Sequence, residues 1–234
     1  MRIIPLIAIL ILKQLMLSGQ VSDAEILLLQ KLDSVKKAPS ISSYFADLYL
    51  ETTVRAVHFT QSKNNKSTTE FMRRMEISFA ELFLHSAESF RVGNKVSPEW
   101  KSYYAASSLK PIQYQLLGIN AHINGDIWKA LVNEFSNGEI RNYRKAYHQF
   151  GKELTAQYKS FYDRSVISNP KLHLLDQASL GFSKWYGTWM LKKWRKRQLR
   201  MAYLYQTDKK RFDQKSKKLN RKMELINQLI LTHL

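Results

Sequence analysis

The chain has 234 residues, of which 44% are hydrophobic, and carries 37 Lys and Arg against 19 Asp and Glu. This length and apolar content suffice for one sizeable domain, and the excess of positive charge favours polyanions or anionic lipid as partners without identifying one. Because there is no cysteine, disulfides and thiolate metal sites are excluded, and any metal would be held by His, Asp, Glu or Asn.

Few Gly and Pro residues, together with apolar residues spaced three and four apart over long segments, predict an all-α fold. We expect a single helical-bundle-like domain over residues 24–206, built around a central buried helix at about 111–133. A basic helix over residues 207–234 is expected to extend it at the C-terminus.

The first residues have the features of a secretory signal. Met1 and Arg2 precede an apolar run over residues 3–12, and Ser18 and Gly19 offer a small-residue cleavage region. The run is too short to span a bilayer. Residues 1–19 are therefore interpreted as a signal peptide, with an apolar membrane-associated or docking helix as the alternative. The protein is expected to be exported or membrane-associated, or otherwise cytoplasmic.

Helices are predicted next at residues 24–36, 42–59 and 69–90, with a polar surface loop over 61–68. Glu76 lies at the margin of the apolar stripe of the third helix, so it is the acidic residue there that is expected to face inward. Glu81 and His85 are one turn apart and could hold a metal, but they project from the opposite side, where a solvated pair is favoured.

Residues 111–133 are predicted to form the central helix, beginning at Pro111, which a first helical turn tolerates. The segment is strongly apolar yet polar on two opposite sides, which indicates a helix enclosed by others. Asn120 and Asn124 lie within its apolar side. Because a buried Asn without hydrogen-bond partners costs about 1 to 3 kcal/mol, the two are predicted to form a specific polar network.

Other predicted elements flank this helix on both sides. Residues 98–104 are predicted to form a short helix packed by Trp100, Tyr103 and Tyr104. Asn137-Gly138 is expected to be a stop signal, and residues 143–161 form an aromatic-rich packing helix with His148 on its surface.

The C-terminal part concentrates the charge, since residues 191–222 contain 14 Lys or Arg against Asp208 and Asp213. A helix over 183–206 carries Trp185, Trp189 and Trp194, which at helical spacing are expected to be core. Beyond it, apolar residues alternate in steps of four and three from Phe212 to Ile230, which predicts a seam for packing on a partner helix. The cations of residues 192–222 are expected either to be solvated or to bind an anionic surface, such as membrane lipid or nucleic acid.

His122 and Asp126 share a helix face, which admits three interpretations. An imidazole and a carboxylate at this spacing could bind one divalent metal such as zinc, manganese or iron, with Glu76 as the first choice for a third ligand. They could instead form a buried hydrogen bond that orients helices, or act in metal-free acid/base chemistry. No P-loop, G-x-S-x-G, Gly-rich dinucleotide or zincin motif is present in the sequence.

Residues 117–127, LGINAHINGDI, closely resemble the L-G-I-N-A-H-I-N-x-D-L signature of the domain-of-unknown-function family 5995. The runs YFADLY at 44–49 and MEISFA at 75–80 are similar to further patterns of that family. The resemblance implies an all-helical domain and marks Asn120, His122, Asn124 and Asp126, with Glu76 and Arg195 as further positions. It names no reaction, and near Arg195 the chain has Gln198-Leu199 where the family has Ala-Trp.

The segment HINGDI at 122–127 is also similar to the H-x-x-G-D-I segment of the helical zinc phospholipase C and P1-type nuclease family, whose His and Asp bind zinc. The Q-P-x-H continuation of that family is missing here. This likeness implies at most one reduced metal site, in which a metal-bound water attacks an ester or phosphoester.

Two hypotheses follow. The first is a metal-assisted hydrolase with His122, Asp126 and Glu76 in its site, ordered by Asn120 and Asn124. The second is a non-catalytic helical binding protein whose basic surface meets an anionic partner.

Overall fold

The computed structural model describes residues 21–61, 65–168 and 182–233, together with residues 170, 173, 174 and 177. These residues form helices and no strand, which confirms the all-α prediction. The predicted signal segment, residues 1–19, lies outside the described residues. The helices are α2 (Asp23–Lys37), α3 (Ser42–Gln61), α4 (Lys66–Arg91), η1 (Pro98–Trp100), α5 (Lys101–Ala105), α6 (Pro111–Ala121), η2 (His122–Asp126), α7 (Ile127–Glu134), α8 (Asn137–Asn142), α9 (Arg144–Ser168), α11 (Phe182–Thr207) and α12 (Lys209–His233).

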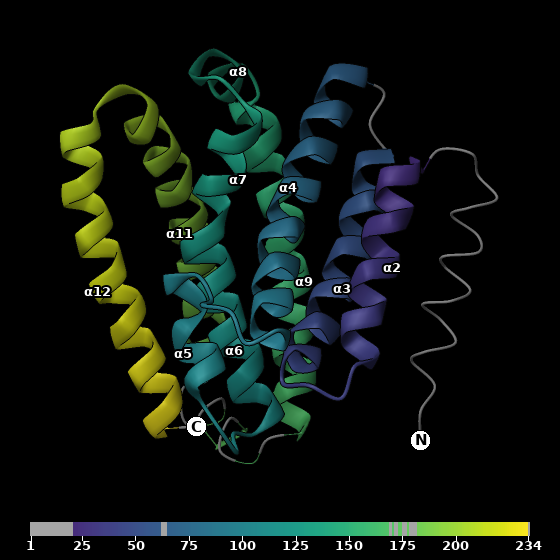
Figure 1. Ribbon diagram of the computed structural model, residues 1–234, viewed down its shortest axis with the longest axis vertical. Helices are drawn as coiled ribbons and strands as arrows, with labels where there is room; N and C mark the ends of the chain where they lie inside the picture. Colours follow the sequence, from purple (N-terminus) through teal and green to yellow (C-terminus); the bar gives the residue numbers. More distant parts are fainter. Residues whose placement is uncertain are drawn as a thin grey trace.

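The long helices run up and down side by side, with α2 and α3 at one edge and the antiparallel pair α11 and α12 at the other (Figure 1). The rod formed by α6, η2 and α7 runs through the middle. It packs against α3 and α4 on one side, against α11 and α12 on the other, and against α5 and η1. The predicted central helix is therefore enclosed, as expected.

A close approach between α3 and α6 depends on Gly118. A side chain at this position would overlap the ring of Phe45, so only glycine allows α3 to lie so close to the central rod. Phe45 itself contacts Phe83 and Trp100 in edge-to-face geometry, with ring centroids 5.0 and 5.3 Å apart. The aromatic core thus begins directly beside the segment that carries His122.

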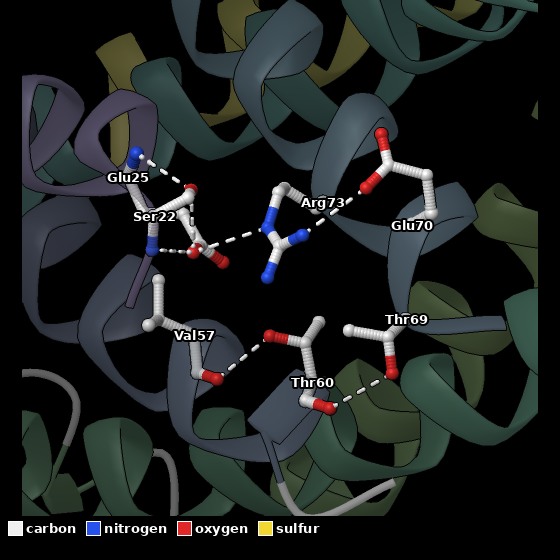
Figure 2. A network of polar contacts seen from close by, with 7 residues as sticks. All are labelled: Ser22, Glu25, Val57, Thr60, Thr69, Glu70 and Arg73. Carbon is white, nitrogen blue, oxygen red and sulfur yellow. Dashed lines mark hydrogen bonds and ion pairs between the residues drawn. The ribbon is translucent and has the colours of Figure 1, made fainter. Parts of the chain in front are cut away.

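Polar contacts join the three N-terminal helices at one end (Figure 2). Ser22 and Glu25 form a capping box at the start of α2, in which the carboxylate accepts from the Ser22 amide at 2.9 Å. The same buried carboxylate pairs with Arg73 of α4 at 3.1 Å. The hydroxyl of Thr69 donates to the carbonyl of Thr60 at 3.3 Å and so ties the start of α4 to the end of α3. These contacts hold α2, α3 and α4 in register.

Three predicted details differ from the structure. The central helix is interrupted, because residues 122–126 form a π-helical turn between two α-helical segments. Helix α4 starts at Lys66, within the predicted loop, because the side chain of Asn65 caps its first turn. Asn137-Gly138 begins α8 instead of ending a helix, since Ser136 and Glu139 form a capping box.

Helix α12 packs through its predicted seam, because Phe212, Leu219, Met223 and Ile230 are all buried. The tryptophan prediction is right only for Trp194, which is buried, whereas Trp185 and Trp189 are 57% and 41% exposed. None of the helices in the described ranges combines the length and the apolarity that crossing a bilayer requires.

Candidate functional site

The π-helical turn carries the candidate site at the middle of the central rod. An extra residue in the turn widens the helix locally, a feature that occurs frequently at functional sites. His122, Asn124, Gly125 and Asp126 are all buried there. A side chain at Gly125 would overlap Glu99, so the glycine lets the short helix η1 lie directly against the turn.

Two donors converge on one oxygen of Asp126. The indole Nε1 of Trp100, in η1, donates to Oδ2 at 2.9 Å, and Nδ1 of His122 lies 3.0 Å from the same atom. Because indole Nε1–H only donates, Oδ2 acts as an acceptor, and the consistent tautomer of His122 has its proton on Nδ1. This leaves a lone pair on Nε2. The predicted contact between His122 and Asp126 is confirmed.

Aromatic rings enclose the imidazole of His122. Phe79 stacks on it with ring centroids 3.5 Å apart, and Tyr49 meets it edge-on at 4.4 Å. The side chain is almost fully removed from solvent, at 2% exposed. Burial lowers the pKa of His122 well below its usual value near 6.5, because the charged form would lose its hydration. The imidazole is therefore neutral at physiological pH, and its Nε2 has no hydrogen-bond partner among the described residues.

Asp126 lies between charges of both signs. Burial raises the pKa of Asp126 well above its usual value, and the carboxylate of Glu99 raises it further. Lys129 acts in the opposite direction, since its ammonium lies 4.0 Å from Oδ1 and also pairs with Glu99. Burial and Glu99 outweigh Lys129, so the pKa of Asp126 stays raised, and its Oδ2 lies behind His122 as the atom that Trp100 and Nδ1 share.

A cavity of about 100 Å³ lies against the other side of His122. Its walls come from α3, α4, α6, η2, α9 and α11. The lining is mainly apolar, and the apolar residues are Phe45, Leu48, Phe79, Ile119, Ile123, Leu154 and Leu191. Where the cavity reaches the surface, it is lined by the half-buried Glu51 and by the exposed Arg55 and Arg164, both of which pair with Glu51. The arrangement is that of a small-molecule pocket with a few polar groups in its wall, among them His122 and Arg195.

Glu76 faces inward, as predicted, but it lies beyond Tyr49 as seen from His122. Its Oε1 accepts from the hydroxyls of Tyr49 and Thr53, both at 3.5 Å. Burial raises the pKa of Glu76 to about 7, although the charge of Arg195 acts to lower it. Among the residues that the structure describes, no three His, Asp or Glu side chains gather closely enough to hold a metal together. Glu76 therefore does not complete a ligand set with His122 and Asp126.

The two asparagines form the predicted network, which connects helices. Asn120 donates to Oδ1 of Asn227 at 2.8 Å and to the carbonyl of Met223 at 3.0 Å, both in α12. Asn124 donates to Oδ1 of Asn120 at 2.9 Å, and Gln198 of α11 donates to the carbonyl of Asn124 at 2.7 Å. The network therefore fixes the π-helical turn to both C-terminal helices.

Replacing Asn124 by leucine should lower the free energy of unfolding by at least about 1 kcal/mol, because Oδ1 of Asn120 would lose its buried donor. Urea denaturation measures the difference. Asn220→Leu, at an exposed position of α12, is the matched control and should change stability little. Equal stability of the two variants would contradict a structural role for the network.

Arg195 is brought to the cavity wall by α11, although it lies within a run of exposed cations. It is 5% exposed, and its guanidinium lies over the rings of Tyr147 and Phe150 at 4.5 and 5.5 Å. Glu81 and His85, in contrast, are exposed, and Glu81 pairs with Lys31. His148 is half-buried, so its predicted place on the surface is only partly right.

Four contributions to the site were not predicted from the sequence. Trp100 was expected only to pack, but it also donates to Asp126, while Phe79 and Tyr49 enclose the imidazole. Asn227 is the partner of Asn120. A signal for Asn227 was present, since it is a polar residue beside the apolar seam of α12.

An all-α domain with a buried His–Asp pair at a π-helical turn is the class that the fold and the site define. Residues 25–233 match the sequence model of the family of unknown function DUF5995. The chain belongs to this family, and α12 falls within the matched region. Searches of curated proteins and of solved structures found no match.

Proposed function

We propose that this protein is a hydrolase of small, mainly apolar esters, in which His122 is the general base. One observation carries the proposal: His122 lines a mainly apolar cavity and its Nε2 has no hydrogen-bond partner among the described residues, while Nδ1 is held by Asp126. A neutral imidazole of fixed tautomer is the arrangement that proton abstraction requires. Next to His122 the lining consists of apolar side chains such as Phe45 and Phe79, which favours an uncharged carboxylic ester over a phosphoester at the reacting group.

The reaction follows from these positions. A water molecule between Nε2 and the ester carbonyl gives its proton to Nε2 as its oxygen bonds to the carbonyl carbon. The imidazolium then returns the proton to the leaving alkoxide as the carbon–oxygen bond breaks, which yields an acid and an alcohol. Asp126 stabilises the imidazolium because Oδ2 accepts the Nδ1 proton. The apolar side chains around His122 limit competing water.

A metal-assisted form of the same reaction would use Nε2 of His122 as a metal ligand, with Asp126 orienting the imidazole from behind. Because no third His, Asp or Glu of the described residues lies close enough, further ligands would come from the substrate, from water or from other groups. Metal analysis of protein purified without an affinity-tag metal separates the two forms. Stoichiometric zinc, manganese or iron that is lost in His122→Ala would favour the metal-assisted form.

The test of hydrolysis uses p-nitrophenyl esters with acyl chains from two to ten carbons, together with a p-nitrophenyl phosphodiester, each with and without a chelator. We expect cleavage of the carboxylic esters to fall by at least about 100-fold in His122→Asn. His85→Asn, which changes an exposed histidine of α4, is the matched control and should keep full activity. Equal rates for His122→Asn and wild type would end this proposal.

The exposed face of α12 supports a second function, binding to an anionic membrane surface. Six of its cations are exposed and form no ion pair within the described ranges; these are Lys210, Lys215, Lys217, Lys218, Arg221 and Lys222. Leu225 and Leu229 are exposed on the same helix, at 60% and 58%. Cations beside exposed apolar side chains favour lipid over nucleic acid.

Vesicles containing phosphatidylserine should therefore retain the protein at low salt and release it steeply as salt rises. Changing Lys210, Lys217 and Arg221 to Gln should weaken retention several-fold. The matched control changes Lys66, Lys95 and Lys145, which are exposed elsewhere, to Gln. If both triple variants bind alike, net charge alone accounts for retention. Tighter binding to single-stranded DNA than to vesicles would indicate nucleic acid, and not lipid, as the partner.

A further inference from the structure

Arg195 is a buried cation that lacks a close counterion among the described residues. No carboxylate of the described residues lies within ion-pair distance of its guanidinium. Its one hydrogen bond to the described part of the chain is long, from Nη2 to the carbonyl of Tyr147 at 3.5 Å, and Nε has no partner. A guanidinium offers five N–H donors, and leaving charged donors unpaired inside a protein is costly. A buried arginine with unpaired donors is suited to binding an anionic ligand.

The surroundings of Arg195 keep it in place. Tyr147 and Phe150 lie beneath the guanidinium as cation–π partners, and the phenol of Tyr147 donates to the backbone carbonyl of Arg195 at 2.9 Å. Gly151 of α9 leaves room for Nε, since a Cβ there would lie 2.9 Å from that atom. The side chain is thus positioned by aromatic packing and a glycine.

Arg195 and His122 line the same cavity, whose other walls are mainly apolar. We infer that the ligand of this pocket is an apolar molecule with a carboxylate at one end, and that Arg195 binds this carboxylate. A planar guanidinium matches a carboxylate through two parallel hydrogen bonds, and such charge-assisted bonds are strong where water is excluded. The inference depends on the cavity being a ligand site, as proposed above, but not on hydrolysis.

Glu76 makes the binding pH-dependent. Its carboxylate faces Tyr49 and Thr53 from α3 and Arg195 from α11, with the more distant Glu25 of α2 also acting on it. Below pH 7 the side chain is mainly protonated, because burial raises the pKa of Glu76 to about 7. Above that pH the ionised Glu76 competes for Arg195 and repels a second carboxylate. Binding of the ligand therefore strengthens as the pH falls from 8 to 6.

Calorimetry with straight-chain carboxylates of four to ten carbons, each paired with its neutral primary amide, tests the inference. The wild-type protein should bind the best-fitting carboxylate at least about 10-fold more tightly than its amide at pH 6. Arg195→Gln should reduce this preference to about twofold or less and leave amide binding unchanged. Arg200→Gln, which changes an exposed arginine of the same helix outside the cavity lining, is the matched control and should keep the preference. In Glu76→Gln, binding of the carboxylate should no longer depend on pH between 6 and 8.

A measurement on the unaltered chain covers the case in which Arg195→Gln does not fold. The arginine Nε–H signal of Arg195 in nitrogen-correlated NMR spectra should shift on addition of the carboxylate and stay in place with the amide. Equal affinity of carboxylate and amide, a preference that survives in Arg195→Gln, or binding of neither ligand would overturn the inference. Carboxylate preference in a protein without esterase activity would uphold it while ending the hydrolase proposal.

Discussion

Asp126→Asn should lower kcat/KM for ester hydrolysis by about 10² to 10⁴-fold, the range typical of losing positioned acid/base catalysis. The substitution keeps the shape of the side chain, so its Oδ1 can still accept from Trp100 and from Nδ1 of His122. It removes the negative charge that stabilises the imidazolium once Nε2 has taken a proton. The loss should therefore appear in the chemical step and not in binding of a substrate analogue.

Steady-state kinetics on the best p-nitrophenyl ester measure this effect, with thermal unfolding as a check that the variant is folded. Asp213→Asn removes an exposed carboxylate from α12 and is the matched control. A folded Asp126→Asn protein with wild-type kcat/KM would show that Asp126 only packs behind the imidazole.

Glu76 should make the wild-type protein less stable as the pH rises from 5 to 8. Burial raises the pKa of Glu76 to about 7 in the folded state, whereas in the unfolded chain it stays near its usual 4.5. Between these values the folded state binds more protons than the unfolded state, so the free energy of unfolding falls with rising pH. The free energy of unfolding lost in this way amounts to roughly 3 kcal/mol once the pH exceeds about 7.

Glu76→Gln keeps the size of the side chain and removes its titration, so its stability relative to wild type should increase with pH over this interval. Urea denaturation at pH 5, 6, 7 and 8 measures the difference between the two chains. Taking the difference matters because His122 acts in the opposite direction: its lowered pKa causes stability to be lost as the pH falls below about 6.5. Glu81→Gln, exposed on the same helix, should follow wild type. Parallel curves for Glu76→Gln and wild type would contradict the buried titration.

The sequence predicts the helices well and the central turn poorly, for a physical reason. Burial of one helix face requires apolar residues every three or four positions, and that pattern is visible in the chain. The π-helical turn at residues 122–126 adds a single residue between two helical segments. One added residue changes the spacing of apolar residues too little to be recognised in the sequence. Asn137-Gly138 is similarly ambiguous. These residue types usually end a helix, but here they follow the N-cap Ser136 and form the first turn of α8.

The site could be predicted only where its partners lie on one helix. His122 and Asp126 are four residues apart, so their contact follows from helical geometry. Trp100 and Asn227 contact the same region from η1 and α12, and the sequence does not predict that these helices pack there. The burial of Arg195 is equally hidden, because Lys193 and Lys196 beside it in the sequence are exposed and only the packing of α9 on α11 distinguishes them.

The proposed function depends above all on a neutral His122 with its proton on Nδ1. Nitrogen NMR of the imidazole tests this protonation state most directly. Spectra of protein labelled at the histidine ring nitrogens, with His122 assigned by its loss in His122→Asn, should be recorded from pH 8 to 5.5. We expect a protonated Nδ1 and an unprotonated Nε2 throughout the range, and a shift of the Nε2 signal when an apolar ester analogue fills the cavity. A proton on Nε2, an imidazolium already formed at pH 6.5, or an Nε2 signal indifferent to every ligand that binds would contradict it.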